Sequence, residues 1–363
     1  MIREQLALAA FRELAQKLGF VVLGVAPARE APDFPQFCDW LEQGYAGSME
    51  YLERRQSAYR HPKHVLEGCE SIVMLAMPYA KHARTLRAKG ARESEPEVTS
   101  QFDEKCAGTI ASYASGSRDY HDVIHERQKK LVAVLSRMFP GAKSRGVVDT
   151  APLLERCFGR LAGLGWQGKN TLLLNRKLGS YFFLSAILTD VKLPASELVE
   201  TDHCGSCRAC LDACPTQAFP SPRVLDAKRC ISYWTIEHRG SIPESIRPGI
   251  SDWLFGCDVC QMVCPWNRKP EPTVDPDLSP EAWSDKTDCL FWLRLDEREF
   301  FKRFRHTPFW RSRLQGMQRN AMIVAANTDR VDAIPAIENL LTCGDPILEE
   351  TARWSLDALA SRE

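Results

Sequence analysis

The stretch CGSCRACLDACP, residues 204 to 215, decides the fold more than any other part of this 363-residue sequence. Its cysteines follow the spacing C-x2-C-x2-C-x3-C-P, which is typical of segments that bind four-iron clusters. A second run, CDVCQMVCP (257 to 265), has one cysteine fewer, and Cys230 stands alone between the two runs. Together they supply eight thiols. That number is enough for two [4Fe-4S] clusters.

Spacing also predicts which cysteines share a cluster. Three closely spaced thiolates can hold three corners of one cubane, while the fourth cysteine of the run points toward the other cluster. We therefore predict two ligand sets, which are Cys204, Cys207, Cys210 and Cys264 for one cluster, and Cys214, Cys230, Cys257 and Cys260 for the other. The alternative is a pair of structural zinc sites. It is disfavoured because zinc sites usually pair two C-x2-C units across a longer spacer.

The composition sets few limits on the partners. Lys plus Arg equals Asp plus Glu, 47 of each, so the net charge excludes neither nucleic acid nor acidic proteins. No apolar run approaches the roughly 20 residues that a bilayer requires. The N-terminal MIREQLALAAFRELAQKLGF reads as an amphipathic helix without a cleavage site. We expect a cytoplasmic monomer with no membrane partner, and in that compartment clustered cysteines bind metal more often than they form disulfides.

The chain predicts α+β layering. Apolar strands are expected at Phe20–Ala26, Ser71–Pro78 and Ser180–Thr189, with helices over 1–19 and about 120–139. Residues 82–107 are polar and are expected to form a surface excursion, and a Pro- and Asp-rich loop over 269–283 marks a boundary. In the helical tail, RNAMIVAANT (319–328) and TARWSLDALA (351–360) are similar amphipathic segments, which indicates a helical repeat. The predicted domains are 1–195, 196–268 and 283–363.

The glycine-rich turn GLGWQGKN (163–170) resembles two nucleotide-binding patterns but fits neither. A phosphate-binding loop requires a strand before it, a helix after it, and a final Ser or Thr. Here Asn170 occupies the last position, a helical segment precedes the turn, and an apolar hairpin follows it. A tight turn rich in N–H donors can still hold a polar edge of a cofactor.

Several segments together resemble the epoxyqueuosine reductase family over essentially the whole chain. They are RHPKHVLEG (60–68), SRDYHDVIHER (117–127), VVDTAPLLER (147–156), GLGWQGKNTLLLN, LGSYFFLSAILTD, the two cysteine runs with Cys230, SYWTIEHRG (232–240) and the helical tail. The resemblance implies an enzyme that reduces epoxyqueuosine to queuosine at the tRNA wobble position, the last step of queuosine biosynthesis. It implies cobalamin and two [4Fe-4S] clusters as cofactors, fed by an external electron donor. It also implies a reductive-dehalogenase-like core with a ferredoxin-like insert and a HEAT-like tail.

The same resemblance assigns roles to particular residues. Asp149 is expected to donate the proton, held protonated by burial between apolar neighbours and a corrin face, although pattern alone also allows a helix N-cap. The glycine turn is expected in the cobalamin-binding core. Residues near the corrinoid are expected to be Arg60, Asn170, Ser180, Ser232 and Asp258. DYHDVI (119–124) lacks the glycine of a cobalt-binding histidine motif, so His121 is interpreted as a packed or hydrogen-bonded histidine.

A flipped base and its phosphates require aromatic and basic side chains. SYWTIEHRG offers Tyr233, Trp234, His238 and Arg239, with a core position as the alternative for Trp234. Residues 298–319 are strongly basic, and we select Arg303, Arg305 and Arg311 as phosphate contacts. Two other functions stay open from the residues: a cobalamin-dependent dehalogenase of a small organohalide, and a non-enzymatic iron–sulfur electron carrier.

Overall fold

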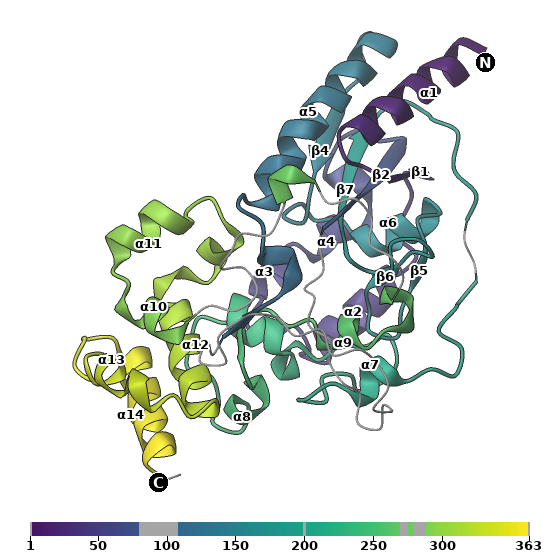
Figure 1. Ribbon diagram of the computed structural model, residues 1–363. Helices are drawn as coiled ribbons and strands as arrows, with labels where there is room; N and C mark the ends of the chain where they lie inside the picture. Colours follow the sequence, from purple (N-terminus) through teal and green to yellow (C-terminus); the bar gives the residue numbers. More distant parts are fainter. Residues whose placement is uncertain (1, 80–107, 199–200, 269–274, 279–287, 362–363) are drawn as a thin grey trace.

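The computed structural model describes residues 2–79, 108–198, 201–268, 275–278 and 288–361 (Figure 1). At its centre lies a four-stranded antiparallel sheet in the order β1-β2-β7-β4. The strands are β1 (Val22–Pro27), β2 (Ser71–Pro78), β7 (Phe182–Thr189) and β4 (Ser144–Val147). The three predicted strands are confirmed. The edge strand β4 was not predicted, because its sequence SRGV carries little apolar character.

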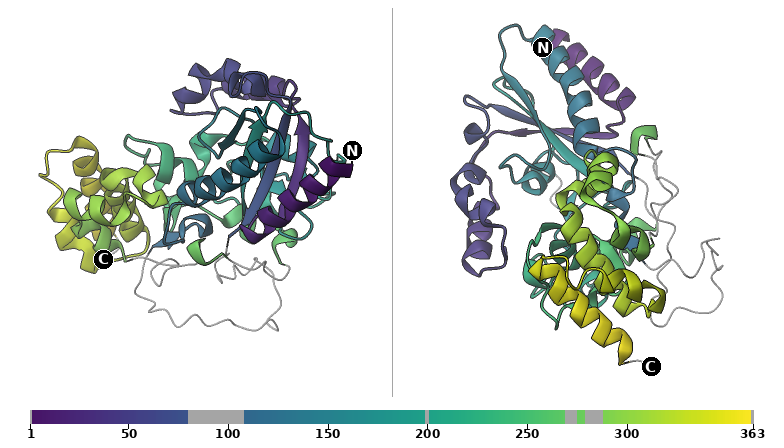
Figure 2. Two further views of the ribbon diagram at one scale, coloured as in Figure 1. Left: turned by 90° about the horizontal axis from the view of Figure 1, so that it is seen from above. Right: turned by 90° about the vertical axis from the view of Figure 1, so that its left-hand side faces the viewer.

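The sheet is buried on both faces, and β2 shows how. Val73, Leu75 and Met77 pack on one side, while Ile72, Met74 and Ala76 pack on the other. This is the period-two alternation of a strand. Helices α1 (Ile2–Lys17) and α5 (Tyr120–Met138) lie side by side over the first face, as Figures 1 and 2 show. They confirm the two predicted helices. The opposite face packs against α6 (Glu155–Leu161).

Short helices α2 (Phe34–Glu42), α3 (Glu50–Arg54) and α4 (Gln56–Arg60) lie beside the sheet, on the side away from α1 and α5 in the right-hand view of Figure 2. Aromatic contacts hold this segment together, including Phe37 against Tyr59 with ring centroids 5.0 Å apart. The segment matters because its C-terminal half lies beside the candidate active site described below.

The cysteine runs surround two short helices, α7 (Ala209–Asp212) and α9 (Val259–Met262), which contact each other. A small hairpin packs against them, made of β5 (Trp166–Gln167) and β6 (Leu173–Leu174). The glycine turn therefore closes a hairpin of its own. The apolar hairpin expected after the turn is only partly present, because β6 pairs with β5 while a single bridge joins Asn175 and Gly179.

The C-terminal part is helical, with α10 (Cys289–Arg294), α11 (Glu297–Phe304), α12 (Arg313–Asn327), α13 (Ile334–Glu338) and α14 (Pro346–Ala360). The two segments with repeat character form α12 and α14, which pack together. One hydrophobic core joins these helices to residues 227–259, including Trp234 and β8 (Trp253–Phe255). The tail and the cysteine region are thus packed as one body, and the predicted domain boundaries stay a prediction.

Parts of two predictions lie outside the described residues, namely the 82–107 excursion with Cys106 and most of the 269–283 loop. Within the described part of the chain, no helix combines the length and the apolar character needed to cross a membrane.

Candidate active site and cluster-binding sites

The first cysteine group surrounds a cavity. Cys204, Cys207 and Cys210 come from the loop before α7 and from α7 itself, and Cys264 follows α9; together they line a cavity of about 210 Å³. Burial raises the pKa of Cys210 to about 11, and neighbouring Cys264, Cys204 and Cys207 raise it further. The four sulfurs predicted to share one cluster are therefore close neighbours.

The second group lies deeper. Burial raises the pKa of Cys257 well above its ordinary value, and the nearby Cys260 and Cys230 thiols raise it further. Burial has the same effect on the pKa of Cys260, whose neighbours include Cys230 and Cys214. Cys210 of the first group also raises the pKa of Cys260, so the two groups lie next to each other. Buried thiols of this kind become thiolates only where a positive centre replaces the proton, and the iron of a cluster supplies one.

A buried donor beside the first group also fits a cluster. Trp166 packs against Cys264 and Cys204, and its indole Nε1–H is buried without a hydrogen-bond partner among the residues that the structure describes. Cluster and cysteine sulfurs accept such hydrogen bonds, and these bonds tune cluster potentials. The residues present thus suit [4Fe-4S] clusters.

The glycine-rich turn holds the cysteine loops. Lys169 Nζ donates to the carbonyls of Gly205 (2.6 Å) and Cys207 (2.8 Å), and Asn170 Nδ2 donates to the carbonyl of Cys260 (3.3 Å). A glycine is required at position 165, because a Cβ there would lie 1.8 Å from the carbonyl oxygen of Leu174. The turn therefore packs against the cluster region. Its expected place in the cobalamin-binding core stays a prediction.

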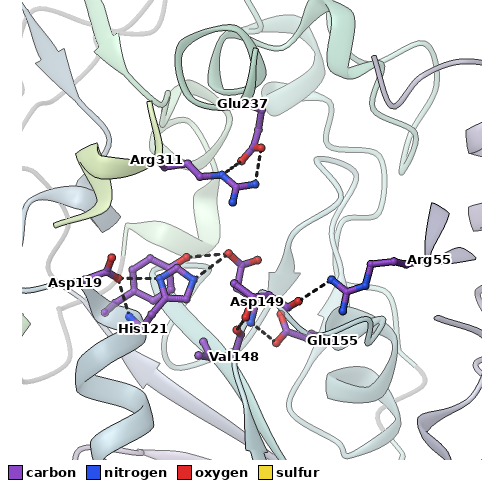
Figure 3. Close-up of polar contacts among 10 residues, drawn as sticks. Arg55, Asp119, His121, Val148, Asp149, Glu155, Glu237 and Arg311 are labelled. Atoms are coloured by element: carbon purple, nitrogen blue, oxygen red, sulfur yellow. Dashed lines mark hydrogen bonds and ion pairs between the residues drawn. The ribbon is translucent and has the colours of Figure 1, made fainter. Parts of the chain in front are cut away.

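Asp149 lies after β4 at the edge of a second cavity. Its backbone has φ +53°, a left-handed conformation that is uncommon outside glycine. Tyr120 OH donates to Asp149 Oδ2 at 3.1 Å, and His121 Nε2 lies 3.3 Å from the same oxygen (Figure 3). His121 Nδ1 in turn contacts Asp119 at 2.8 Å. Asp149 is no helix cap, since α6 begins at Glu155 with Leu154 as its N-cap residue.

The cavity beside Asp149 measures about 210 Å³, and most of its walls are aromatic or aliphatic side chains. Its lining residues are Tyr79, Tyr113, Tyr120, Asp149, Glu155, Arg156, Leu172, Leu173, Ser180, Phe182, Phe183 and Leu184. It is concave and open, so that 63% of the Asp149 side chain is accessible even though protein surrounds it on several sides. Such apolar walls with polar groups at the edge can face one side of a larger ring system that extends through the open mouth of the cavity.

The polar neighbours of Asp149 set the direction of its pKa in the protein alone, and its expected protonation over a corrin face stays a prediction. Burial raises the pKa of its carboxyl, but hydrogen bonds from His121 and Tyr120 and the charges of His121 and Arg311 outweigh burial, so the pKa lies below the ordinary value. Although burial opposes it, hydrogen bonds and charges from Asp119 and Asp149 raise the pKa of His121 to about 9.

Two further contacts fix the loop that carries Asp149. The backbone N–H of Asp149 donates to Glu155 Oε1 at 2.9 Å, and Arg55 Nη1 donates to the carbonyl of Thr150 at 3.2 Å (Figure 3). Burial, with the charge of Asp149 as a smaller cause, raises the pKa of Glu155 to about 8. The left-handed conformation of Asp149 is thus held from both sides.

Helix α9 connects the second cysteine group to this pocket. Gln261 Nε2 donates to Ser180 Oγ at 3.1 Å and lies 3.4 Å from Tyr79 OH, and both acceptors belong to pocket-lining residues. Asp258 is buried, and its carboxylate accepts the backbone N–H of Ser112 at 2.7 Å. Its charge raises the pKa of Tyr79 and Tyr113, so it lies between the cysteines and the pocket.

Three residues expected near the corrinoid are outside the lining of the cavity beside Asp149, and their role stays a prediction. Arg60 ends α4 and pairs with Glu30, with Nε 2.9 Å from the carboxylate. Ser232 lies against Cys230, where its hydrogen bonds oppose the rise that burial causes in the pKa of that thiol. Asn170 reaches the carbonyl of Cys260, as described above. Of the five expected residues, Ser180 lines the pocket and Asp258 lies beside it.

The candidate RNA contacts separate into two kinds. Arg311 binds the Glu237 carboxylate through Nε (3.1 Å) and Nη2 (2.7 Å), and Figure 3 shows its guanidinium on the side toward Asp149. Arg239 donates to the carbonyl of Arg311. Arg303 and Arg305 precede Arg311 in the tail and are exposed. Arg303 Nε donates to the Glu299 carboxylate at 3.0 Å.

Arg319, Trp234 and Tyr233, from the segments considered for RNA contacts, are buried in the protein. Arg319 is 1% exposed and donates to the carbonyls of Trp234, His238 and Gly240. Trp234 and Tyr233 are both buried in the core that joins the cysteine region to the tail. The core alternative for Trp234 is therefore correct.

Sequence reasoning missed the residues that act on Asp149 from a distance along the chain. His121 was interpreted only as a packed or hydrogen-bonded side chain, while Arg55, Glu155 and Glu237 were not considered. The signal for His121 was present, because DYH places an acid two residues before a histidine at a helix start. Its link to Asp149 depends on the packing of α5 beside β4, which the motif does not contain.

Comparison with known proteins agrees with this geometry. The model for a "4Fe-4S double cluster binding domain" matches residues 203–267, and the model "Epoxyqueuosine reductase QueG, DUF1730" matches residues 60–150. The chain is 37% identical to the epoxyqueuosine reductase of Pseudomonas aeruginosa, over 96% of this chain and 93% of the relative. It is 34% identical to that of Escherichia coli, over 95% of this chain and 89% of the relative.

Solved structures give the same family. A crystal structure of epoxyqueuosine reductase with an epoxyqueuosine-modified tRNA-Tyr stem loop matches with a TM-score of 0.85 at 29% identity, covering 97% of this chain and 89% of that one. The Bacillus subtilis epoxyqueuosine reductase, with its catalytic aspartate loop swung out of the active site, matches with a TM-score of 0.85 at 28% identity, covering 97% and 90%. The expected fold with its double-cluster region is confirmed.

Proposed function

This chain belongs to the epoxyqueuosine reductase family, and on that premise we propose that it reduces epoxyqueuosine to queuosine at the wobble position of tRNA. One observation carries the proposal. Two adjoining groups of four cysteines lie next to a pocket that holds a hydrogen-bonded aspartate and histidine. An electron path and a proton source thus meet at one cavity, which is what a reductive opening of an epoxide requires.

The reaction takes two electrons and two protons, and it releases water as the epoxide becomes an alkene. We assign Cys204, Cys207, Cys210 and Cys264 to one [4Fe-4S] cluster, and Cys214, Cys230, Cys257 and Cys260 to the other. Clusters transfer electrons singly, whereas cobalamin supplies a two-electron reductant when it is bound. The pocket beside Asp149 suits a corrinoid, with apolar and aromatic walls for the macrocycle and Ser180 as a polar contact at its edge.

The chain's own residues supply the proton. His121 holds it at Nε2, hydrogen-bonded to Asp149 Oδ2, while Asp119 orients the imidazole through Nδ1. As negative charge develops on the epoxide oxygen, Asp149 transfers the proton of His121 to that oxygen, because an alkoxide is a poor leaving group. Asp149 thus acts as the proton donor to substrate, with His121 as its reservoir.

The substrate base lies in a single-stranded loop, so moving it out of its stack costs little. Arg311 contributes positive charge on the side of the pocket that faces Asp149, and its pairing with Glu237 fixes its direction. We assign Arg239 a supporting role through its contact with the Arg311 backbone. Arg303 and Arg305 are assigned to phosphates further from the base.

The test is an analysis of modified nucleosides in cells that lack this protein. We expect epoxyqueuosine to accumulate in their tRNA, and queuosine to return when the gene is restored but not when its Asp149→Asn variant is. Unchanged queuosine in the deletion strain contradicts the proposal. We also infer that the protein acts in the cytoplasm, where its tRNA substrate is found, as a monomer supplied by an external electron donor.

A further inference from the structure

The first cysteine group contains the one exposed thiol of the eight, that of Cys207. Gly205, Ser206, Cys207 and Arg208 are consecutive exposed residues around the cavity of the first group. Cys214, Cys230, Cys257 and Cys260 of the second group are each only partly exposed. The second group also lies nearer to the Asp149 pocket, through Asp258 and Gln261. Electrons from outside the protein must therefore arrive at the first group.

Positive charge concentrates around this exposed group. The residues that we call the cluster face are Lys169, Arg176, Lys177, Arg208 and Arg223, together with the acids Asp202 and Asp212. Lys169 Nζ donates to the Cys207 carbonyl, Arg223 Nε donates to the Gln167 carbonyl at 3.3 Å, and Arg176 Nη2 lies 2.9 Å from His203 Nε2. Arg208 pairs with Asp212 and Arg223 pairs with Asp202, so five cations less two acids leave a net charge of +3 in a chain whose net charge is zero.

An aromatic block extends the cluster face away from the cysteines. Trp166, His203 and Trp266 pack edge to face or tilted, with ring centroids 4.7 to 5.7 Å apart, and Trp166 also contacts Cys264. Behind Trp166 lies a surface hollow of about 960 Å³ whose charged lining residues, within the described chain, are Arg12, Arg176 and Lys177. The hollow gives the face a concave, positively charged edge.

We propose that the cluster face is the docking site of a small acidic one-electron carrier protein of the flavodoxin or ferredoxin kind. The inference rests on the proposed function, because the first cysteine group must hold a cluster for the carrier to reduce. Charge complementarity between such partners raises the rate of encounter and fixes their orientation. In the step itself, the reduced carrier loses one electron and the exposed cluster gains it, and no bond is formed or broken.

The tRNA substrate is also strongly negative, so it could bind the same basic surface as the acidic carrier protein. The observations favour a protein carrier here, because RNA delivers no electrons and the cluster face surrounds the exposed cysteines. Arg311, the basic residue that faces Asp149, belongs instead to the tail segment between α11 and α12. In Figure 1, α7 lies at the opposite side of the molecule from α11.

Binding of an acidic flavodoxin to the holoenzyme, measured by calorimetry over a range of salt concentrations, tests the proposal. The variant is Lys177→Glu with Arg208→Glu. Its matched control is Lys130→Glu with Arg137→Glu, which makes the same change of charge on exposed positions of α5. We expect affinity to fall about tenfold or more in the variant, with a weaker salt dependence, and to be unchanged in the control. Stopped-flow reduction of the clusters by reduced flavodoxin should slow in parallel.

Other results contradict the proposal. They are equal losses in both double variants, no salt-sensitive binding of flavodoxin by the parent enzyme, or a variant that loses tRNA affinity but keeps flavodoxin affinity. Iron content and dithionite-driven turnover of the parent enzyme test the proposed function separately, since dithionite needs no docking site. An enzyme that is active with dithionite but indifferent to the carrier overturns only the docking site.

Discussion

At the scale of single residues, the site depends on two side chains that share a proton. Asp149 was identifiable from the sequence through family resemblance, but the hydrogen bonds that act on its carboxylate were not. These bonds come from His121 and Tyr120, which α5 brings to Asp149 from about thirty positions earlier in the chain. A local apolar pattern such as VVD indicates desolvation, whereas the hydrogen bonds that outweigh it exist only after packing.

Replacing Asp149 by Asn tests its role in proton transfer. Asn cannot pass on a proton, so turnover should fall by about a hundredfold or more while clusters and corrinoid are retained. The size and hydrogen-bonding capacity of the side chain change little, so the melting temperature serves as the control. Near-normal turnover of this variant at neutral pH contradicts a role in proton transfer.

The titration of His121 provides a second test. Its pKa is raised to about 9, so the ring should carry a proton at neutral pH, and turnover should fall as the pH rises through about 9. A raised folded-state pKa also means that the contacts of His121 stabilise the fold fully below about pH 6.5, and this contribution is lost as the pH rises through about 9.

NMR of ring-labelled histidine should detect this titration directly. In Asp149→Asn the pKa of His121 should move back toward its ordinary value, because one of its two acidic partners is gone. His125, one turn further along α5, is the internal control, since burial lowers its pKa. A His121 pKa near its ordinary value in the parent protein contradicts the proton reservoir.

At the scale of elements, cysteine spacing predicted the two groups because ligand order within such runs is constrained by cubane geometry. The strands were predictable from apolar runs, since β2 and β7 are buried on both faces. The hairpin of β5 and β6 was not, because two-residue strands have no period to detect. Neither was the burial of Arg319, whose partners are carbonyls of residues about eighty positions earlier.

A Cys214→Ser variant tests the exchange of ligands between the two runs. Cys214 belongs to the first run in sequence but is assigned to the cluster of Cys230, Cys257 and Cys260. EPR of the reduced variant should show that this cluster is lost or converted, while the cluster of the first cysteine group stays intact. The parent protein should contain about eight irons per chain. Damage confined to the cluster of Cys204, Cys207 and Cys210 contradicts the assignment.

Exposed basic residues of the tail should contribute to RNA affinity. Replacing Arg303 and Arg305 by Gln should weaken tRNA binding and reduce the salt dependence by roughly one log–log unit for each phosphate that the protein no longer binds. Lys129→Gln with Lys130→Gln on α5 is the matched control, as both side chains are exposed. Unchanged affinity and salt slope in the tail variant assign the RNA to another surface.

At the scale of the whole molecule, the sheet, the cysteine region and the helical tail meet around one pocket. The sheet supplies Asp149 and its α5 partners, the cysteine region supplies Asp258 and Gln261, and the tail supplies Arg311. Sequence patterns predicted the three parts in order. They did not predict that the tail shares its core with residues 227–259, because that packing joins helices to a segment with little regular structure.

The most direct test of the proposed activity is single-turnover conversion of a tRNA anticodon stem loop that carries epoxyqueuosine. Anaerobic protein with both clusters, cobalamin and a chemical reductant is mixed with this stem loop, and the nucleosides are analysed by mass spectrometry. We expect the modified base to lose one oxygen, giving queuosine, and to stay unchanged without protein. Unaltered epoxyqueuosine in the presence of fully loaded, reducible protein contradicts the proposed reaction.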